Sequence, residues 1–137
     1  MKKWKEKSLT NLTPLEYIIF KNVPMKDSSH GPIIDLPPDA LDKLAASAII
    51  LERIPLRGKE VKFLRKVIGL SLERFAGKLG LSSGTVFHWE KAENDRLALV
   101  NEIAVRTFVA EELDIEISSK FSDLVGDKIH EIQVRAS

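Results

Sequence analysis

The most constraining feature of the chain is the stretch Ser71–Glu90, in which small and apolar residues recur at the spacing of two short helices joined by a tight turn. Ala76 is small where two helices cross closely, Gly80 can take the positive φ that ends a helix, and Val86 can pack between the helices. The other apolar positions keep helical spacing and are Phe75, Leu79, Leu81 and Trp89. The stretch therefore predicts two closely packed helices with a sharp turn at Gly80.

Two serines stand where these helices are expected to begin. Ser71 and Ser82 each precede a predicted helix, and a serine hydroxyl at that position accepts a hydrogen bond from a first-turn amide. Two such caps, one glycine stop and a matched apolar frame are together typical of a helix-turn-helix. The alternative interpretation is a plain two-helix corner in a protein core, in which the serines serve only as caps.

A helix-turn-helix implies the reading of duplex DNA, because its second helix fits the major groove. Serine, threonine and histidine side chains hydrogen-bond to base edges, and an aromatic ring or a methyl group packs on the thymine methyl group. The start of a helix attracts phosphate through its free amides. The residues expected at DNA are Ser71, Ser82, Ser83, Gly84, Thr85, Phe87, His88 and Lys91.

Apolar residues at helical spacing flank this unit on both sides. The segment Leu56–Gly69 predicts a helix that ends at its glycine, and a second helix is predicted from Asp95 to about Glu112. One apolar face of the second helix would fill the core of the bundle. Leu99 and Ile103 lie on another face, so they are candidates for a dimer interface.

From about Gly58 to Leu113 the sequence resembles the Cro/C1-type (XRE) helix-turn-helix domain. The residues that carry the resemblance are Arg65, Gly69-Leu70-Ser71, Ala76, Gly80 and Trp89-Glu90. The resemblance implies a five-helix, lambda-repressor-like bundle, with an ion pair between Arg65 and Glu90 that ties its first helix to the end of the DNA-reading helix. The sequence differs from the family at Leu72, where a glutamine often contacts DNA, and at Ala92, which is often a glycine.

The net charge of +1 hides an uneven distribution of charge along the chain. Between Glu52 and Arg96 there are ten Lys or Arg residues against six Asp or Glu residues, a net charge of +4. From Leu97 to Ser137 there are four against eight, a net charge of −4. Such asymmetry is typical of a DNA face opposite a solvated or protein-facing surface, although ordinary solvated faces fit charges of this size nearly as well.

The N-terminal third predicts a small appendage made of a basic arm, a β-hairpin and a helix. The Lys-Lys-Trp-Lys start is expected to be a disordered, solubilising arm, with a basic arm that reaches DNA phosphates as the alternative. The β-forming segment Tyr17–Val23 and the segment Ile33–Leu36 predict a hairpin, and a helix is expected from Pro38 to before Pro55. The order of strand pair, helix and helix-turn-helix resembles the MqsA-type antitoxins, in which an N-terminal zinc ribbon held by cysteine pairs binds a toxin. Those cysteines are absent here, so zinc is not carried over.

The C-terminal segment 114–137 is expected to be a dimerisation or packing element. Apolar and polar residues alternate at Leu113–Ile117 and again at Ile132–Ala136, which predicts two short strands, with a turn of helix near Phe121 between them. The predicted division is therefore an appendage over residues 1–54, the helix-turn-helix domain over 55–113 and the tail over 114–137. The fold class expected is mostly α: a five-helix, lambda-repressor-like bundle with a small N-terminal β-hairpin and helix appendage.

Several functional classes find no support in the sequence. The chain has no cysteine, which excludes disulfides and thiolate metal sites and fits a cytoplasmic protein. No apolar run approaches the ~18 residues of a membrane span. His30, His88 and His130 are widely separated, none with a second ligand three or four residues away. No catalytic residue, metal or cofactor is therefore predicted, and an enzyme is not expected.

Together these features predict a sequence-specific, DNA-binding transcriptional regulator. The preferred role is an antitoxin-like autorepressor with a cognate toxin as partner. The alternatives are a stand-alone repressor without a toxin, and a protein-interaction module whose helix-turn-helix no longer binds DNA. A homodimer on an inverted-repeat operator is expected, because two recognition helices about 34 Å apart match one turn of DNA.

Overall fold

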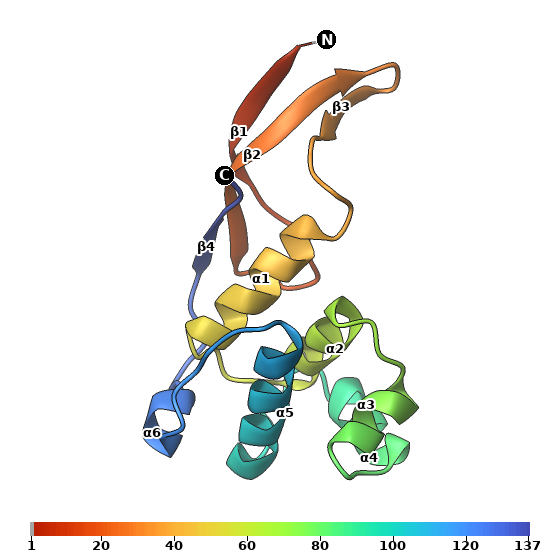
Figure 1. The fold of residues 1–137 in the computed structure, drawn as a ribbon, viewed down its shortest axis with the longest axis vertical. Helices are drawn as coiled ribbons and strands as arrows, with labels where there is room; N and C mark the ends of the chain where they lie inside the picture. The colour runs from red at the N-terminus through yellow and green to blue at the C-terminus, as the bar shows by residue number, and fades with distance from the viewer. Residues whose placement is uncertain (1) are drawn as a thin grey trace.

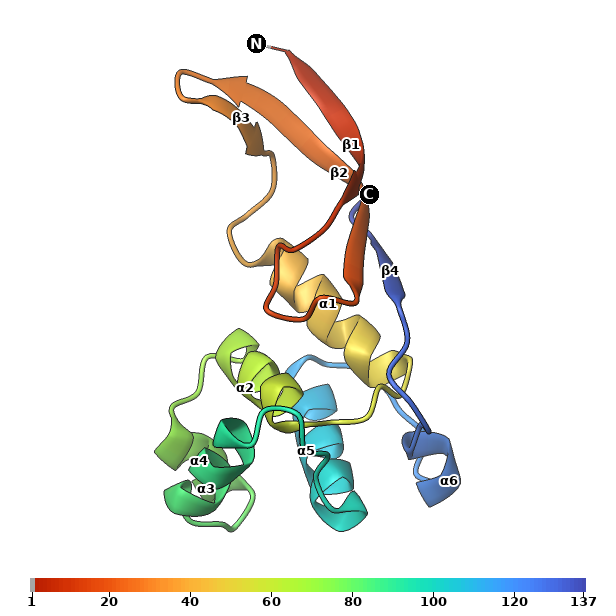
Figure 2. The same cartoon turned by 180° about the vertical axis from the view of Figure 1, so that it is seen from behind.

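The computed structural model describes residues 2–137 and places a sheet at one end of an elongated molecule and most of its helices at the other (Figure 1). In chain order the elements are β1 (Lys3–Leu9), β2 (Ile18–Ser28), β3 (Gly31–Ile34), α1 (Ala40–Leu51), α2 (Gly58–Val67), α3 (Leu72–Lys78), α4 (Ser83–Lys91), α5 (Leu99–Glu112), α6 (Phe121–Leu124) and β4 (Ile132–Arg135). Helix α1 lies between the sheet and helices α2 to α5, and this arrangement is visible from both sides (Figures 1 and 2).

The expected fold class is wrong. Within residues 2–137 the structure has six helices and a four-stranded mixed sheet, which is an α/β fold and not a five-helix bundle with a small appendage. The difference arises because both ends of the chain enter the sheet. The N-terminal segment expected as a disordered arm forms β1, and the C-terminal β4 lies parallel to β2.

The long strand β2 organises the sheet. Phe20 lies between Leu9 of β1 and Val134 of β4, so these two strands flank β2 on opposite edges. Further along, β3 pairs antiparallel with β2 on the β4 edge, with Met25 opposite Ile34. The gap between β3 and β4 is closed by Ser137, whose hydroxyl donates a 2.6 Å hydrogen bond to the carbonyl oxygen of Asn22.

Two further local predictions are wrong. The alternating segment Leu113–Ile117 is not a strand, because it follows α5 through a turn with Asp114 at a φ of +57° and pairs with no strand of the described residues. The helix expected from Asp95 begins only at Leu99, since the segment before it runs beside the start of α2. There the Leu97 amide donates to the carbonyl of Leu56 at 2.9 Å.

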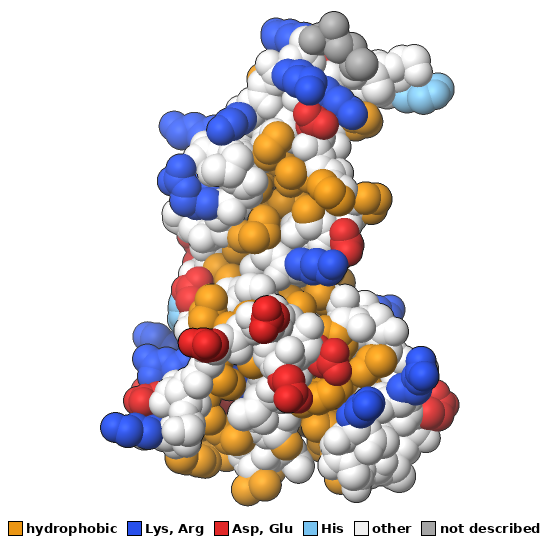
Figure 3. All heavy atoms as spheres, in the orientation of Figure 1, with side chains coloured by type: hydrophobic (Ala, Val, Ile, Leu, Met, Phe, Trp, Pro, Cys, Tyr) orange, Lys and Arg blue, Asp and Glu red, His pale blue; other side chains and the backbone are white. Residues whose placement is uncertain are grey.

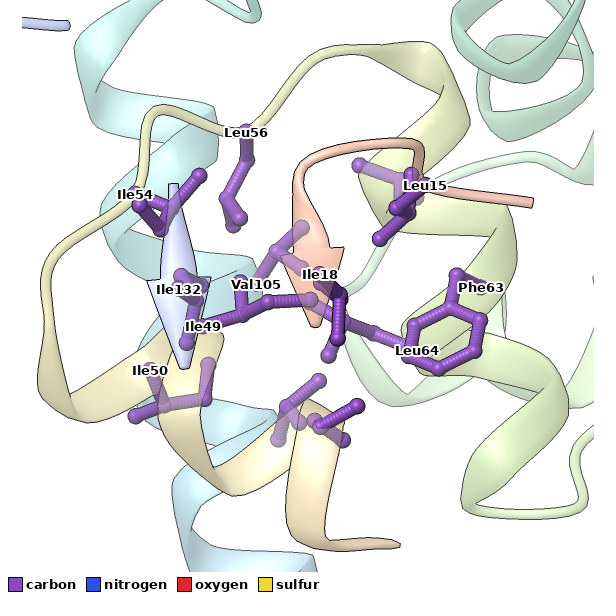
Figure 4. Packing of buried hydrophobic residues seen from close by; sticks show 14 of the residues in the cluster. Leu15, Ile18, Ile49, Ile50, Ile54, Leu56, Phe63, Leu64, Val105 and Ile132 are labelled. Atoms are coloured by element: carbon purple, nitrogen blue, oxygen red, sulfur yellow. The ribbon is translucent and has the colours of Figure 1, made fainter. Parts of the chain in front are cut away.

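One hydrophobic cluster joins the sheet to the helices (Figure 4). Ile18 of β2 and Ile132 of β4 meet Ile49 of α1, and the same cluster continues to Leu64 of α2 and Val105 of α5 (Figure 4). All five side chains are essentially buried. The orientation of α2, and of the helices packed on it, is therefore coupled to the sheet through shared core contacts.

A buried arginine closes the carbonyl end of α1. The last carbonyls of a helix have no partner within the helix, and Arg106 of α5 supplies one. Its guanidinium donates to the carbonyl oxygens of Ile49 and Ile50 at 3.3 Å and of Ile54 at 2.5 Å. The carboxylate of Glu102 lies 3.5 Å from Arg106, so the buried charge is compensated within α5.

Candidate nucleic-acid interface

Helices α3 and α4 form the predicted helix-turn-helix. The Ser71 hydroxyl accepts a 3.2 Å hydrogen bond from the amide of Arg74, and the Ser82 hydroxyl accepts one of the same length from the amide of Thr85. Gly80, with a φ of +73°, follows the end of α3. Both predicted caps and the glycine stop are confirmed, because each depends only on residues a few positions away.

The apolar frame of the pair is buried as its spacing predicted. Phe75, Ala76 and Val86 are fully buried, so α3 and α4 approach each other closely. Phe75 also packs edge to face on Phe108 of α5, with ring centroids 5.8 Å apart and an interplanar angle of 67°. Aromatic rings favour this geometry, so the contact holds helices α3 and α4 against α5.

The structure brings Arg65 of α2 and Glu90 of α4 together in a two-point ion pair. Nε and one terminal nitrogen of Arg65 donate to the two carboxylate oxygens of Glu90 at 2.7 and 2.9 Å. The other terminal nitrogen donates to the carbonyl of Leu70 at 2.9 Å. Hydrogen bonding to Glu90 raises the pKa of Arg65, and only 12% and 7% of the two side chains are exposed. The pair therefore fixes α4 relative to α2.

Sequence reasoning missed a close backbone contact at Gly58. A Cβ built on Gly58 would overlap the carbonyl oxygen of Trp89 and would lie 2.7 Å from that of Ala92. The start of α2 therefore touches the end of α4 directly, and only glycine fits there. The sequence offered one signal of this contact. Glycine disfavours a helix, so a glycine at the start of one indicates that another segment approaches its backbone closely.

The residues expected at DNA fall into three groups on the surface. Ser71 stands alone at the start of α3. Ser82, Ser83, Gly84 and Thr85 form the first turn of α4, where the hydroxyls of Ser82 and Thr85 lie 2.9 Å apart in a hydrogen bond.

The third group lies toward the end of α4 and is made of Phe87, His88 and Lys91, all exposed. Lys91 Nζ lies 5.8 Å from the centroid of the Phe87 ring, and the His88 ring lies 6.2 Å from it at a tilt of 60°. Phe87 is 48% exposed. This half of α4 therefore combines a cation, an imidazole and an apolar ring on one surface.

A shallow hollow of about 370 Å³ lies beside this group. It is lined by Lys62 and Arg65 of α2, by Leu72 of α3, by Phe87, Glu90 and Lys91 of α4, and by Glu93 just after α4. Lys62 and its neighbour Lys66 are exposed on α2, four residues apart on one helix face. Lys62 was not among the residues expected at DNA, although its spacing from Lys66 indicated a basic helix face.

Comparison of the chain with family models, curated proteins and solved structures found no match. Across residues 2–137, no helix is both long enough and apolar enough to pass through a membrane. The proposal for function therefore rests on the geometry of the helix pair.

Proposed function

We propose that the chain is a sequence-specific DNA-binding transcriptional regulator that places α4 in the major groove. The observation that carries the proposal is the division of α4 into two faces. Its buried residues are Val86 and Glu90, whereas Gly84, Phe87, His88 and Lys91 are exposed at positions i, i+3, i+4 and i+7. That spacing places all four exposed residues on one face of the helix, and a helix that presents such a face is the element that fits the groove.

The side chains on this face suit both bases and phosphates. His88 can hydrogen-bond to a base edge, and Phe87 can pack on a thymine methyl group. Lys91 and Lys62 line the same hollow, so both can contact phosphates on that side of α4. Thr85 already shares a hydrogen bond with Ser82, so only part of the hydrogen-bonding capacity of its hydroxyl is left for a base.

At the first position of α3, the side chain of Leu72 cannot hydrogen-bond to DNA. The hydroxyl of Ser71 is engaged by the Arg74 amide, so contacts of α3 with phosphate are expected to come from its first-turn amides. Lys62 lines the same hollow as Leu72 and supplies positive charge there. The expected footprint is therefore centred on α4 and α2.

The wider role in this proposal is an antitoxin-like autorepressor that acts as a cytoplasmic homodimer on an inverted repeat. Support for self-association comes from the start of α5, where Leu99 is 40% exposed and Val100 is 78% exposed. Two adjacent apolar side chains on the surface beside the helix pair suit a two-fold contact that would set the spacing of the recognition helices.

The test is selection of bound duplexes from a random pool by the full chain, followed by affinity measurements on the enriched sequence. Replacing both Phe87 and His88 by alanine is expected to weaken specific binding by about 30-fold or more, because each good base contact contributes about 1–3 kcal/mol and two are lost. The matched control replaces Phe121 and His130, which are also exposed but lie in α6 and before β4. Failure to enrich any sequence, or equal affinities of the two double variants, would overturn the proposal.

A further inference from the structure

The strand β1 carries lysines at alternate positions. Lys3, Lys5 and Lys7 are all exposed, whereas Trp4 and Glu6 between them are half-buried and share a 3.0 Å hydrogen bond. Side chains alternate between the two faces of a strand, so the three lysines point away from the buried side of the sheet.

The pairing register adds the basic residues of the other strands to the same face. Lys3 lies directly opposite Lys26 of β2, and Lys21 of β2 lies opposite Arg135 of β4. Directly opposed residues place their side chains on one face of a sheet. Lys21 and Lys26 also adjoin the buried Phe20 and Met25, which face the core.

An irregularity at Asn22 keeps the basic face continuous along β2. The buried residues of this strand are Ile18, Phe20, Val23 and Met25, so the alternation shifts by one residue between Phe20 and Val23. Asn22 has a φ of +53°, which produces the shift. Without it, Lys21 and Lys26, which are five residues apart, would lie on opposite faces.

Little negative charge compensates this face, which we call the lysine face: Lys3, Lys5, Lys7, Lys21, Lys26 and Arg135. Asp35 lies 3.5 Å from both Lys3 and Lys26, and Glu131 precedes β4. Six cations against these two carboxylates form a strongly positive patch in a chain with a net charge of only +1. Figure 3 shows Lys and Arg side chains gathered around the sheet end of the molecule.

Protection of an exposed sheet edge does not explain the whole patch. Lysines on an edge strand discourage pairing with another chain, and this accounts for Lys3, Lys5 and Lys7 of β1. It does not account for Lys21 and Lys26, because β2 is the central strand and is paired on both edges. The cations extend across β1, β2 and β4.

We propose that the lysine face is a second nucleic-acid surface, which binds the phosphate backbone of duplex DNA without reading its sequence. A lysine-rich surface suits phosphates better than protein, because the centres of protein–protein interfaces are depleted in lysine. The sheet lies at the end of the molecule opposite to α3 and α4 (Figures 1 and 2), so this surface is distinct from the interface on α4. It holds a neighbouring segment of DNA, or a second duplex, while α4 occupies its site.

The test measures binding of the full chain to a random-sequence duplex over a range of salt concentrations. Lys5, Lys7 and Lys21 are replaced together by glutamine, and the control replaces Lys43, Lys120 and Lys128, which are exposed outside the sheet. Both triple variants lose the same charge. The sheet variant is expected to bind about tenfold more weakly than the control, with a salt slope smaller by about 2–3, since each lost phosphate contact contributes about 0.9.

Further variants separate the possible causes of a loss. Replacing the same three lysines by arginine keeps the charge and is expected to retain binding. If the glutamine variant lost binding because it misfolded, this charge-conserving variant would not be expected to bind normally. The Phe87 and His88 double variant is expected to keep its affinity for the random duplex. Binding by the lysine face can therefore be measured even if α4 does not bind DNA as proposed.

Equal affinities of the two glutamine variants for the random duplex would overturn the proposal. So would a sheet variant that loses binding of poly-L-glutamate but keeps binding of DNA, because the lysine face would then take an acidic polypeptide.

Discussion

The hydroxyl of Tyr17 donates a 2.9 Å hydrogen bond to Oε2 of Glu60, and this contact joins the segment that leads into β2 to helix α2. Glu60 is fully buried and also accepts from Nε of Arg57 at 2.8 Å. Helix α2 in turn holds α4 through Arg65 and Glu90. The sheet and the candidate DNA-reading helix are therefore linked through two polar contacts on opposite ends of α2.

Replacing Tyr17 by phenylalanine is expected to lower the free energy of unfolding by about 1.5–3 kcal/mol, the range for a hydrogen bond to a charged group. The phenyl ring keeps the packing, so the loss reports the hydroxyl alone. Urea denaturation at neutral pH measures it. An unchanged midpoint would show that the contact with Glu60 contributes nothing to stability.

The same tyrosine predicts a loss of stability at alkaline pH. Burial, with the neighbouring Glu60 carboxylate, raises the pKa of Tyr17 above its ordinary value of 10.0. Above pH 10 the unfolded chain loses the phenolic proton while the folded chain retains it, so the free energy of unfolding falls as pH rises. This fall is expected to be shallower in the Tyr17→Phe variant, and denaturation curves between pH 8 and pH 11 compare the two. Parallel pH profiles would contradict the assignment.

The Arg65 and Glu90 ion pair predicts a strong non-additive effect on stability. Glu90→Gln and Arg65→Met each leave one largely buried group uncompensated and are expected to cost about 3 kcal/mol. The double variant is expected to cost clearly less than the sum of the single losses, because it leaves no unpaired charge. Thermal or chemical denaturation of the four proteins completes the cycle, and strictly additive losses would mean that the pair contributes no coupling energy.

Two glycines in neighbouring helices predict opposite responses to alanine. At Gly58 the added methyl group would overlap the Trp89 carbonyl, so Gly58→Ala is expected to destabilise the fold and to weaken DNA binding by displacing α4. At Gly77 in α3 no atom lies within 4 Å of an added Cβ. Gly77→Ala is therefore expected to be neutral or to stabilise by up to about 1 kcal/mol. Melting temperatures that shift equally in both variants would contradict this reading of the α2–α4 contact.

The exposed start of α5 predicts a dimer. Replacing Leu99 and Val100 by serine is expected to shift the protein from dimer to monomer in sedimentation at tens of micromolar and to reduce binding to an inverted repeat. The control is Leu51→Ser at the end of α1, where the side chain is 59% exposed but distant in sequence from the helix pair. A wild-type monomer that protects one half-site would rule out the dimer.

Several features followed from the sequence alone because each depends on residues close together in the chain. The caps at Ser71 and Ser82 and the turn at Gly80 all arise within one or two helical turns. A helix satisfies its hydrogen bonds within itself, so apolar spacing and end signals suffice to place it. The exposed face of α4 followed from the same local spacing.

The sheet was decided by the tertiary structure. A strand needs a neighbour at hydrogen-bonding distance, and the neighbour of Ile18 is Ile132, from the other end of the chain. Leu113–Ile117 shows the same alternation as Ile132–Ala136 but meets no strand edge, so it remains irregular. The Lys-Lys-Trp-Lys start predicted a disordered arm, but from Lys3 on it pairs with the edge of β2 as β1. Local pattern thus determined the helix pair, whereas the meeting of distant segments determined the sheet, the lysine face and the core that joins them to α2.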